Sequence, residues 1–353
     1  MDLINSNSTG RKITPPRPDL SRLLCCPVCK QELASQPERF ACAHCRRTYP
    51  IVLRIPDLRV YSDPYITIEQ DHEKGRIVQA QADRMSFAEL LRFYWENVSL
   101  PPTRVDLREG FIRHVLSDQA RVESFANQLG SGNACLDVGC GAGSLIGAAQ
   151  RSFEVVIGCD VAFRWLVLAR KRLHEAGATA NLVCCCADYL PFPAESFDLV
   201  TAISSLEHVP DARAVVGECA RVQCGGGRLF VWTANRFSVA PEPHVHIWGV
   251  GFLPRRWMAA YVKWRRGLPY DKQHLLSCFE LRRMLKRSRY DSFAFSLPSV
   301  TEEDLRGRSR MEKLGARVFR FLSNVLLFRW LLTPISPALL LLAKKRGNDR
   351  DQV

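Results

Sequence analysis

Residues 136–145 read LDVGCGAGSL, and Gly139, Gly141 and Gly143 follow directly on the apolar run that ends at Val138. Glycine lets a backbone turn sharply and lie directly beneath a ligand, because it has no β-carbon. The next residues, SLIGAAQR, are typical of a helix. In an open α/β sheet, ligands bind at the carboxyl ends of the strands, where such loops lie. The stretch therefore predicts a strand, a ligand-binding turn and a helix.

Short apolar runs alternate with helix-like segments from Asn133 onward. We expect seven strands, at residues 134–139, 154–160, 181–188, 196–204, 228–234, 292–300 and 338–345. Strands that alternate with helices of about 10 to 15 residues imply a parallel sheet covered on both faces. Near-continuous apolar strands fit that double burial. The pattern predicts an α/β, Rossmann-like sheet.

Acidic residues end three of these strands in succession. Asp137 ends the first strand, Asp160 ends the second, and Asp188 ends the third. A carboxylate at the second position can accept both hydroxyls of a ribose, and one at the third can accept from an adenine amino group. Three carboxylates would repel a pyrophosphate, and the glycine spacing is not that of a dinucleotide site. We therefore expect a ligand with an adenosine and a cationic tail, which favours S-adenosylmethionine over NAD.

The segments LDVGCGAG, GCD, CADYLPFPAESFDLVTAISSLEHVPD and ARVQCGGGRLFV together resemble the class I S-adenosylmethionine-dependent methyltransferases, particularly the ubiquinone and menaquinone biosynthesis group. Gln223 and Cys224 depart from the Lys-Pro pair that is usual there. The resemblance implies a seven-stranded methyltransferase sheet. It also implies roles for the following residues: Asp137 at the methionine amino group, Gly139, Gly141 and Gly143 along the methionine arm, Asp160 at the ribose, Asp188 and Tyr189 at the adenine edge, and Ser204 beside the sulfonium.

His208, in SSLEHVPD, follows the fourth predicted strand. A sulfonium is already an activated leaving group, so the protein has to position the acceptor and take a proton where the acceptor carries one. His208 is a candidate general base, and the alternative is that it holds its loop structurally. Glu207 has the same two interpretations.

The segment CCPVCKQELASQPERFACAHCRRTYPI pairs Cys26-x2-Cys29 with Cys42-x2-Cys45. Two such knuckles can converge on a tetrahedral, closed and therefore structural zinc site of four thiolates, with Cys25 as a bystander. With its trailing TYPIVLRIPDL, the segment is similar to the small zinc-ribbon proteins that activate tRNA and protein methyltransferases. That resemblance implies a scaffold for the catalytic domain or for its substrate.

Four parts are expected along the chain: a disordered tail at residues 1–19, a zinc ribbon at 20–60, a helical linker or cap at 61–128, and a methyltransferase domain at 129–353 with a substrate-side insertion at about 235–290. The N-terminus, MDLINSNSTGRKITPP, shows no apolar signal-peptide core. We expect a cytoplasmic protein with reduced cysteines, and we expect Cys184, Cys185 and Cys186 to be small core residues.

The formal net charge of +13 is concentrated late in the chain. Residues 133–239 carry 9 Lys/Arg against 10 Asp/Glu, whereas residues 254–290 carry 11 against 2. A local basic surface indicates either an anionic partner or a solvated face. The insertion also contains aromatic residues beside arginines, which suits a sugar, a nucleobase or a phosphorylated lipid. Two of its histidines, His244 and His246, make a poor metal pair, because we see no carboxylate beside them.

Residues 330–343, WLLTPISPALLLLA, contain Pro334 and Pro337 and are too short for a membrane span, so none is expected. Residues 318–332 interleave apolar and Arg residues, which allows peripheral membrane contact. Three functions therefore compete. They are a methyltransferase on a small, glycan or lipid-linked anionic acceptor, a methyltransferase on RNA, and a non-catalytic cofactor-binding partner protein. Against RNA, the N-P-P-[FY] signature is absent after the fourth strand, which ends in ISSLEH.

Overall fold

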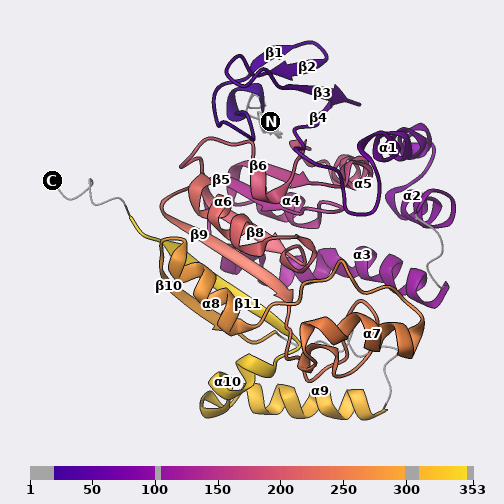
Figure 1. Cartoon of the computed structure of the whole chain (residues 1–353), viewed down its shortest axis with the longest axis vertical. Helices are drawn as coiled ribbons and strands as arrows, with labels where there is room; N and C mark the ends of the chain where they lie inside the picture. The colour runs from indigo at the N-terminus through magenta and orange to yellow at the C-terminus, as the bar shows by residue number, and fades with distance from the viewer. Residues whose placement is uncertain (1–19, 100–104, 299–309, 348–353) are drawn as a thin grey trace, which may run out of the picture.

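The computed structural model describes residues 20–99, 105–298 and 310–347, and a seven-stranded sheet forms its centre (Figure 1). The predicted tail at residues 1–19 and the end of the sixth predicted strand lie outside the described residues. The strands are β5 (Gly132–Val138), β6 (Phe153–Asp160), β7 (Leu182–Cys184), β8 (Phe197–Ile203), β9 (Gln223–Ala234), β10 (Tyr290–Ser296) and β11 (Ala338–Lys345). Their order is β10-β11-β9-β8-β5-β6-β7, so the predicted α/β fold is confirmed.

Strands β5 to β9 are parallel to their neighbours, but β11 runs antiparallel to both β9 and β10. Between β10 and β11 lie α9 (Arg310–Ser323), α10 (Leu326–Leu332) and the 3-10 turn η7 (Thr333–Ile335). These elements stay at one end of the sheet in Figure 1. The chain therefore re-enters the sheet from the end at which it left, and such a return produces an antiparallel strand.

Helices cover both faces of the sheet, and each face has its own hydrophobic cluster. One face carries α3 (Val105–Ala126), α4 (Ser144–Ala149) and α5 (Phe163–Glu175), and α1 (Ile68–Ala82), α2 (Phe87–Phe93) and the π turn η2 (Tyr94–Val98) pack outside them. The other face carries α6 (Ala212–Val222) and α8 (Cys278–Arg287). Cys184, Cys185 and Cys186 are buried, so the prediction that they are small core residues is confirmed.

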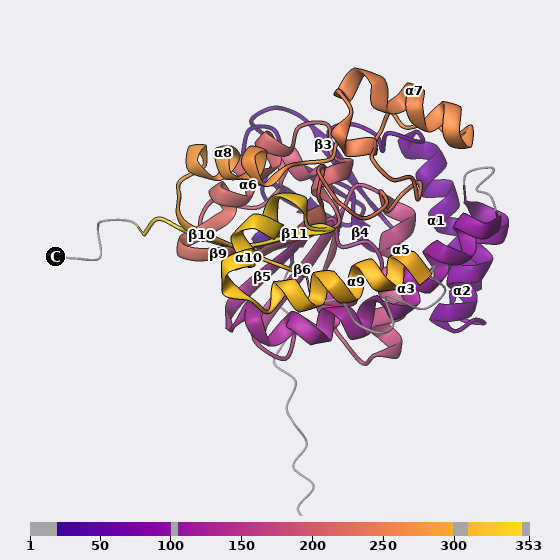
Figure 2. The same cartoon turned by 90° about the horizontal axis from the view of Figure 1, so that it is seen from below.

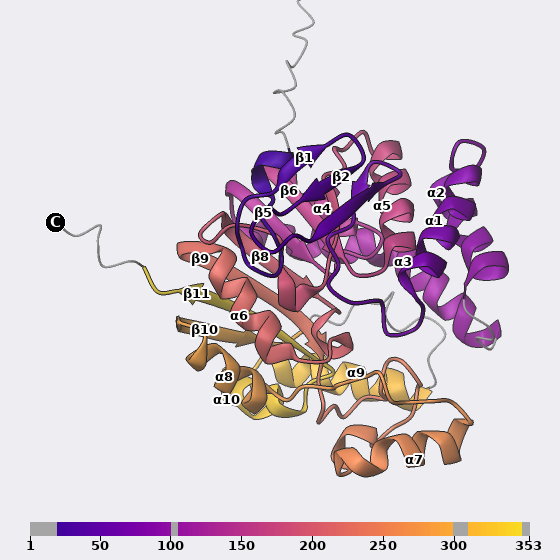
Figure 3. The ribbon, with the colours of Figure 1, turned by 45° about the horizontal axis from the view of Figure 1, so that its top comes forward.

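The cysteine-rich segment forms a small sheet of its own, in the order β1-β2-β3-β4. It consists of the turn η1 (Leu20–Leu23) and the strands β1 (Ala34–Gln36), β2 (Arg39–Ala41), β3 (Thr48–Val52) and β4 (Ile55–Pro56). Figure 3 shows this unit, which we call the ribbon, above the β6 side of the large sheet. Just after β4, the Leu58 amide donates a hydrogen bond to the Cys184 carbonyl oxygen at 2.8 Å. The ribbon therefore covers the open edge of the large sheet at β7.

The ribbon also fills a place on one face of the sheet. The connection from β7 to β8 contains only the 3-10 turn η4 (Ala187–Tyr189), so no long helix covers the sheet there. Phe40 and Tyr49 of the ribbon join the same buried cluster as Leu190 and Phe192 from that connection. The ribbon is thus part of the core of the large domain.

The segment between β9 and α8 contains the turn η6 (Val250–Phe252) and α7 (Arg255–Arg266), with a small cluster of its own around Val250, Met258 and Val262. In Figures 1 and 2 it lies at the same end of the molecule as α9. This is the carboxyl end of the parallel strands. Among the described helices, none has the length and apolar character needed to cross a bilayer.

Candidate functional site

A cavity of about 410 Å³ opens at the carboxyl ends of β5, β6 and β8. Six of the residues predicted for the site line it: Asp137, Gly139, Gly141, Asp160, Ser204 and His208. Gly143, Asp188 and Tyr189 are not among the lining residues. The far wall comes from α3 and from residues 61–65, which follow the ribbon directly.

The three glycines have left-handed backbone conformations, with φ of 73° at Gly139, 48° at Gly141 and 75° at Gly143. A β-carbon on Gly139 would lie 2.5 Å from the Cβ of Ser205, whereas one on Gly141 would have no atom within 4 Å. Gly139 is therefore required for packing of the loop, and Gly141 leaves open space at the cavity. The motif thus combines a backbone requirement with a ligand-facing position.

A buried carboxylate, Asp137, and a half-buried one, Asp160, project at this loop. Asp137 is 3% exposed and accepts a 2.7 Å hydrogen bond from the Thr201 hydroxyl. Burial raises the pKa of Asp137 to about 7, which the Thr201 hydrogen bond opposes and the nearby Asp160 reinforces. Asp160 accepts from the amides of Gly141 at 2.9 Å and Ala162 at 2.8 Å, yet burial still raises its pKa. A cationic or hydrogen-bond-donating ligand would relieve both groups.

Strand β7 ends at Cys184 and Asp188 lies in η4, so the prediction that Asp188 ends the third strand is wrong. Asp188 and Tyr189 lie behind a residue that sequence reasoning missed. The Tyr61 hydroxyl donates to Asp188 Oδ1 at 2.5 Å, and the Tyr61 ring meets that of Tyr189 edge-on at 6.3 Å. Tyr61 itself lines the cavity. The adenine-edge role of Asp188 and Tyr189 stays a prediction, with Tyr61 as a further candidate for that edge. No sequence pattern marks Tyr61, because only the docking of the ribbon brings it to the cavity.

A buried ion network fixes the segment after the ribbon. Arg59 pairs with Asp57 at 2.5 Å and with Asp71 at 2.7 Å. Arg164 at the start of α5 pairs with the same Asp71 at 2.8 Å and with Asp63 at 3.1 Å. Asp63 and Arg164 line the cavity. Because buried charges are costly unless paired, this network holds the linker in one place against the cavity.

The loop after β8 contributes a strained residue and an unpartnered hydroxyl. Ser204 has φ of 49°, which is uncommon for a residue with a side chain. The Ser205 hydroxyl is buried, with no hydrogen-bond partner within the described part of the chain. Both line the cavity. Strained backbone and unsatisfied polar groups concentrate at ligand sites.

His208 contacts the insertion. Its Nε2 lies 3.2 Å from Nε2 of His244, whose Nδ1 lies 2.5 Å from a carboxylate oxygen of Glu242. Glu207 is buried and accepts a 2.7 Å hydrogen bond from the Thr233 hydroxyl. The expectation that no carboxylate accompanies His244 is therefore wrong. Glu242, two residues upstream of His244 in the sequence, was the available signal. The side chain of His246 is exposed and does not belong to this cluster.

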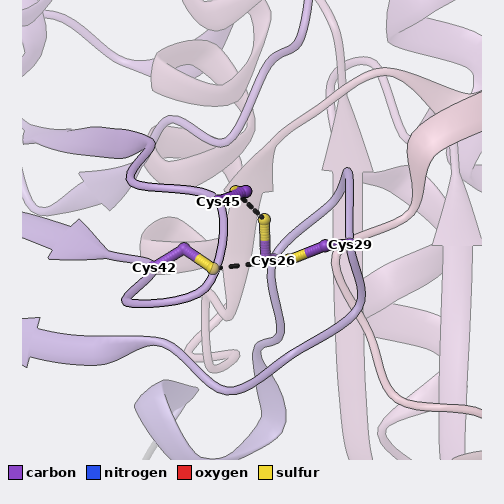
Figure 4. A group of neighbouring side chains, drawn as sticks. All are labelled: Cys26, Cys29, Cys42 and Cys45. Carbon is purple, nitrogen blue, oxygen red and sulfur yellow. Dashed lines mark hydrogen bonds between the residues drawn. The ribbon is translucent and has the colours of Figure 1, made fainter.

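The four predicted zinc ligands converge, as Figure 4 shows. Cys26 Sγ lies 3.5 Å from Cys45 Sγ, and Cys29 Sγ lies 3.4 Å from Cys42 Sγ. All four sulfur atoms lie within 4.8 Å of one another. Zinc with four bonds of about 2.3 Å would separate its sulfur ligands by about 3.8 Å, so the cluster fits zinc closely. Burial raises the pKa of the Cys26 thiol, but hydrogen bonds from the Cys29 backbone and from Tyr49 outweigh it and lower the pKa to about 6.

The strand order, the glycine loop after β5 and the acids at the strand ends define a class I S-adenosylmethionine-dependent methyltransferase domain. Residues 136–231 match the methyltransferase domain family. The chain is 33% identical over 167 residues to a ubiquinone biosynthesis O-methyltransferase of Idiomarina loihiensis, a match that covers 47% of this chain and 64% of that one. It is 40% identical over 107 residues to the enzyme of the same name from Thiobacillus denitrificans, which covers 30% and 46%. The chain thus spans less than two thirds of either relative.

Among solved structures, the YcgJ protein of Bacillus subtilis is similar at 20% identity and a TM-score of 0.43, over 65% of this chain and 99% of that one.

Proposed function

We propose that this chain transfers a methyl group from S-adenosylmethionine to a small or lipid-linked acceptor. One observation carries the proposal: the glycine loop and the carboxylates of Asp137 and Asp160 converge on one cavity. Asp137, which is 3% exposed, would hold the methionine ammonium. Asp160 would hold the ribose, and Gly141 gives the ligand room to approach. The Ser205 hydroxyl is a further donor or acceptor for the ligand.

The cofactor supplies a methyl group on a sulfonium, so the carbon–sulfur bond breaks toward the sulfur as the bond to the acceptor forms. The protein has to align the acceptor and exclude water. His208 lines the cavity, and burial lowers its pKa, with Glu207 opposing and His244 reinforcing that effect. A neutral imidazole can take a proton from an acceptor hydroxyl or amine. His208 is therefore the candidate base.

The ribbon supports the cavity without taking part in the transfer. Four thiolates would leave a zinc ion no open position for water or substrate, so the ion we propose there is structural. Its effect would reach the cavity through residues 57–65, which run from β4 to the cavity wall.

A lipid-linked acceptor is favoured by α9. Its exposed apolar side chains recur at helical spacing: Met311 (80% exposed), Leu314 (59%), Val318 (49%) and Phe321 (71%). Each follows directly on a basic residue: Arg310, Lys313, Arg317 and Arg320. An apolar stripe beside a basic stripe is the pattern of a helix that lies in the surface of an anionic membrane. We infer that α9 brings the domain to such a surface.

The insertion adds a second surface of the same kind. Trp257 and Trp264, seven residues apart on α7, are 54% and 78% exposed. Arg256 and Arg265 lie over these rings at 5.2 Å and 5.7 Å. Because α7 and α9 lie at the same end of the molecule (Figure 1), both would meet one anionic surface.

Methyl transfer is tested by incubating the purified chain with methyl-labelled cofactor and fractionated lipid, small-molecule and RNA extracts. We expect label in the lipid or small-molecule fraction, and its loss in His208→Gln. Label confined to RNA, together with RNA binding that falls steeply with salt, would replace the proposal by the RNA alternative. Cofactor binding with no label in any fraction would favour a non-catalytic partner protein.

A further inference from the structure

Glu207, His208 and His244 form a cluster at the wall of the cofactor cavity. One ligand atom from each side chain lies within 4.8 Å of those of the other two. The turn η5 (Leu206–His208) provides two of them, and the insertion provides the third. His208 and His244, 36 positions apart in sequence, thus meet only because the insertion folds back over the end of β8.

The distances within the cluster suit a metal ion. The two Nε2 atoms of His208 and His244 are 3.2 Å apart. Bonds of about 2.0 to 2.1 Å, at angles between octahedral and tetrahedral, place two nitrogen ligands about 2.8 to 3.4 Å apart. The observed separation falls inside that interval.

Glu242 orients the ring of His244. Its carboxylate oxygen lies 2.5 Å from Nδ1, and two backbone amides, those of His244 and Val245, donate to the same carboxylate at 2.8 Å. A proton on Nδ1 leaves the lone pair of the neutral ring on Nε2, which faces His208. A carboxylate behind a ligating histidine is the usual arrangement around a protein-bound metal, because it fixes the ring and its tautomer.

The charge balance points the same way. Glu207 and Glu242 are 2% and 4% exposed. Within residues 20–99, 105–298 and 310–347, neither carboxylate is ion-paired with a lysine or an arginine. Buried carboxylates need a compensating positive charge, and a protonated His244 would supply only one for the two acids. A divalent cation between Glu207 and the two histidines would balance both acids.

We propose that Glu207, His208 and His244 bind a divalent transition-metal ion, with Glu242 as the positioning residue behind His244. Two histidines and one carboxylate leave further coordination positions open. His208 lines the cavity, so an open position would receive an oxygen of the methyl acceptor. A bound ion would lower the pKa of a coordinated hydroxyl, so that its proton could pass to solvent water, and His208 would then act as a ligand and not as the base. The inference thus rests on the proposed function and narrows its acceptor to one with a metal-binding oxygen.

The test uses the full chain with its ribbon site filled by zinc. After brief treatment with a chelator and gel filtration, the protein is titrated with Co²⁺, and bound cobalt is measured by metal analysis and by its visible spectrum. Thiolate ligands give sulfur-to-cobalt charge-transfer bands, so cobalt in the ribbon is recognised and subtracted. We expect about one equivalent of cobalt with nitrogen and oxygen ligands.

Variants locate the ion. His244→Ala should lose the nitrogen–oxygen cobalt signal, and Glu242→Gln, which preserves shape, should bind Co²⁺ about 10- to 100-fold more weakly. His274→Ala is the matched control, because its exposed side chain is not part of the cluster while its amide, which bonds Glu207, is retained. It should bind cobalt like the unmodified chain. Equal cobalt binding in all variants, or no binding in the unmodified chain, would overturn the inference.

Calorimetry with S-adenosylmethionine on the same samples separates the two proposals. If the chain binds the cofactor but not cobalt, the metal-site proposal is contradicted and the proposed function still stands. The opposite outcome is also informative. If the chain binds cobalt, loses that binding in His244→Ala and does not bind the cofactor, the metal site is supported and the proposed function is contradicted.

Discussion

The amide of Gly141 donates a 2.9 Å hydrogen bond to the carboxylate of Asp160, and so joins the glycine loop after β5 to the end of β6. The same carboxylate accepts from the Ala162 amide, at the start of the segment leading into α5. One acid therefore both shapes the loop and faces the cavity. Asp160 therefore holds the glycine loop in place before any ligand binds.

Replacing Asp160 should weaken cofactor binding strongly. Asp160→Ala removes the ribose acceptor and both amide contacts, and hydrogen bonds to a charged group contribute about 1.5 to 3 kcal/mol. We expect the dissociation constant for S-adenosylmethionine to rise at least about tenfold by calorimetry. Asp291→Ala, which removes an exposed acid paired with Arg346, is the control and should bind normally. Unchanged affinity in Asp160→Ala would contradict the assigned site.

A β-carbon at Gly139 should disrupt the loop. Gly139→Ala meets both a φ of 73° and a 2.5 Å approach to Ser205, so we expect a loss of about 1 to 3 kcal/mol in unfolding free energy together with weaker cofactor binding. Gly217→Ala is the matched change inside α6, where the added carbon has no neighbour within 4 Å. It should stabilise the protein by about 0.5 to 1 kcal/mol. Thermal and urea unfolding measure the stability of the two variants. Equal changes in Gly139→Ala and Gly217→Ala would contradict a special requirement for glycine at position 139.

Cofactor binding should depend on pH through Asp137. Its pKa is raised to about 7, so below that pH the carboxyl is protonated and must lose a proton to meet an ammonium. Affinity should therefore rise as pH increases from about 5.5 to 7, with proton release on binding. The folding stability of the free protein should depend on pH in the opposite direction from the cofactor affinity. Ionising a group whose folded pKa exceeds its unfolded value of about 3.9 costs stability, so this contribution falls as pH rises toward 7.

Calorimetry in buffers of different ionisation enthalpy measures the released proton. Asp137→Asn should lose the dependence, whereas His208→Gln should keep it and so exclude the histidine as its source. A pH profile that survives in Asp137→Asn would assign the titration to another group.

Loss of one ribbon cysteine should affect the distant cavity. Cys42→Ser removes a zinc ligand, so we expect the zinc content to fall, the melting temperature to drop and the cofactor affinity to weaken, because residues 57–65 lose their anchor. Cys25→Ser is the neighbouring control and should keep about one zinc per chain, since Cys25 lies outside the four-sulfur cluster. Full zinc content in Cys42→Ser would show that the cluster is not the metal site.

The exposed stripe of α9 should bind anionic lipid. We expect co-sedimentation with vesicles of phosphatidylglycerol and weaker binding to neutral phosphatidylcholine or at high salt. Phe321→Asp should reduce vesicle binding about tenfold or more, because burial of a phenyl ring is worth about 1.5 to 3 kcal/mol. Ile77→Asp, a like change at an exposed apolar position on α1, should leave vesicle binding unchanged. Equal binding to both lipid types would argue against this surface.

The strands, the glycine loop and the cysteine pairs could be predicted because each is a local pattern. The run ACLDV is followed within a few residues by three glycines that need positive φ, and the two C-x-x-C knuckles sit at a spacing that a zinc ribbon uses. The antiparallel direction of β11 could not be predicted this way. Its residues, ALLLLAKK, are apolar in either direction, and only the path of α9 and α10 decides which end enters first.

The sequence by itself determined the strand–turn–helix unit, the acids at the ends of β5 and β6 and the four-sulfur cluster, because backbone conformation and ligand spacing depend on neighbouring residues. Tertiary structure alone decided that Tyr61 shields Asp188, that Arg164 and Asp63 form the cavity wall, and that His244 meets His208. These contacts join positions 36 to 127 residues apart. They form because the ribbon and the insertion must bury their own apolar surfaces on the sheet, and no short pattern encodes where those surfaces meet.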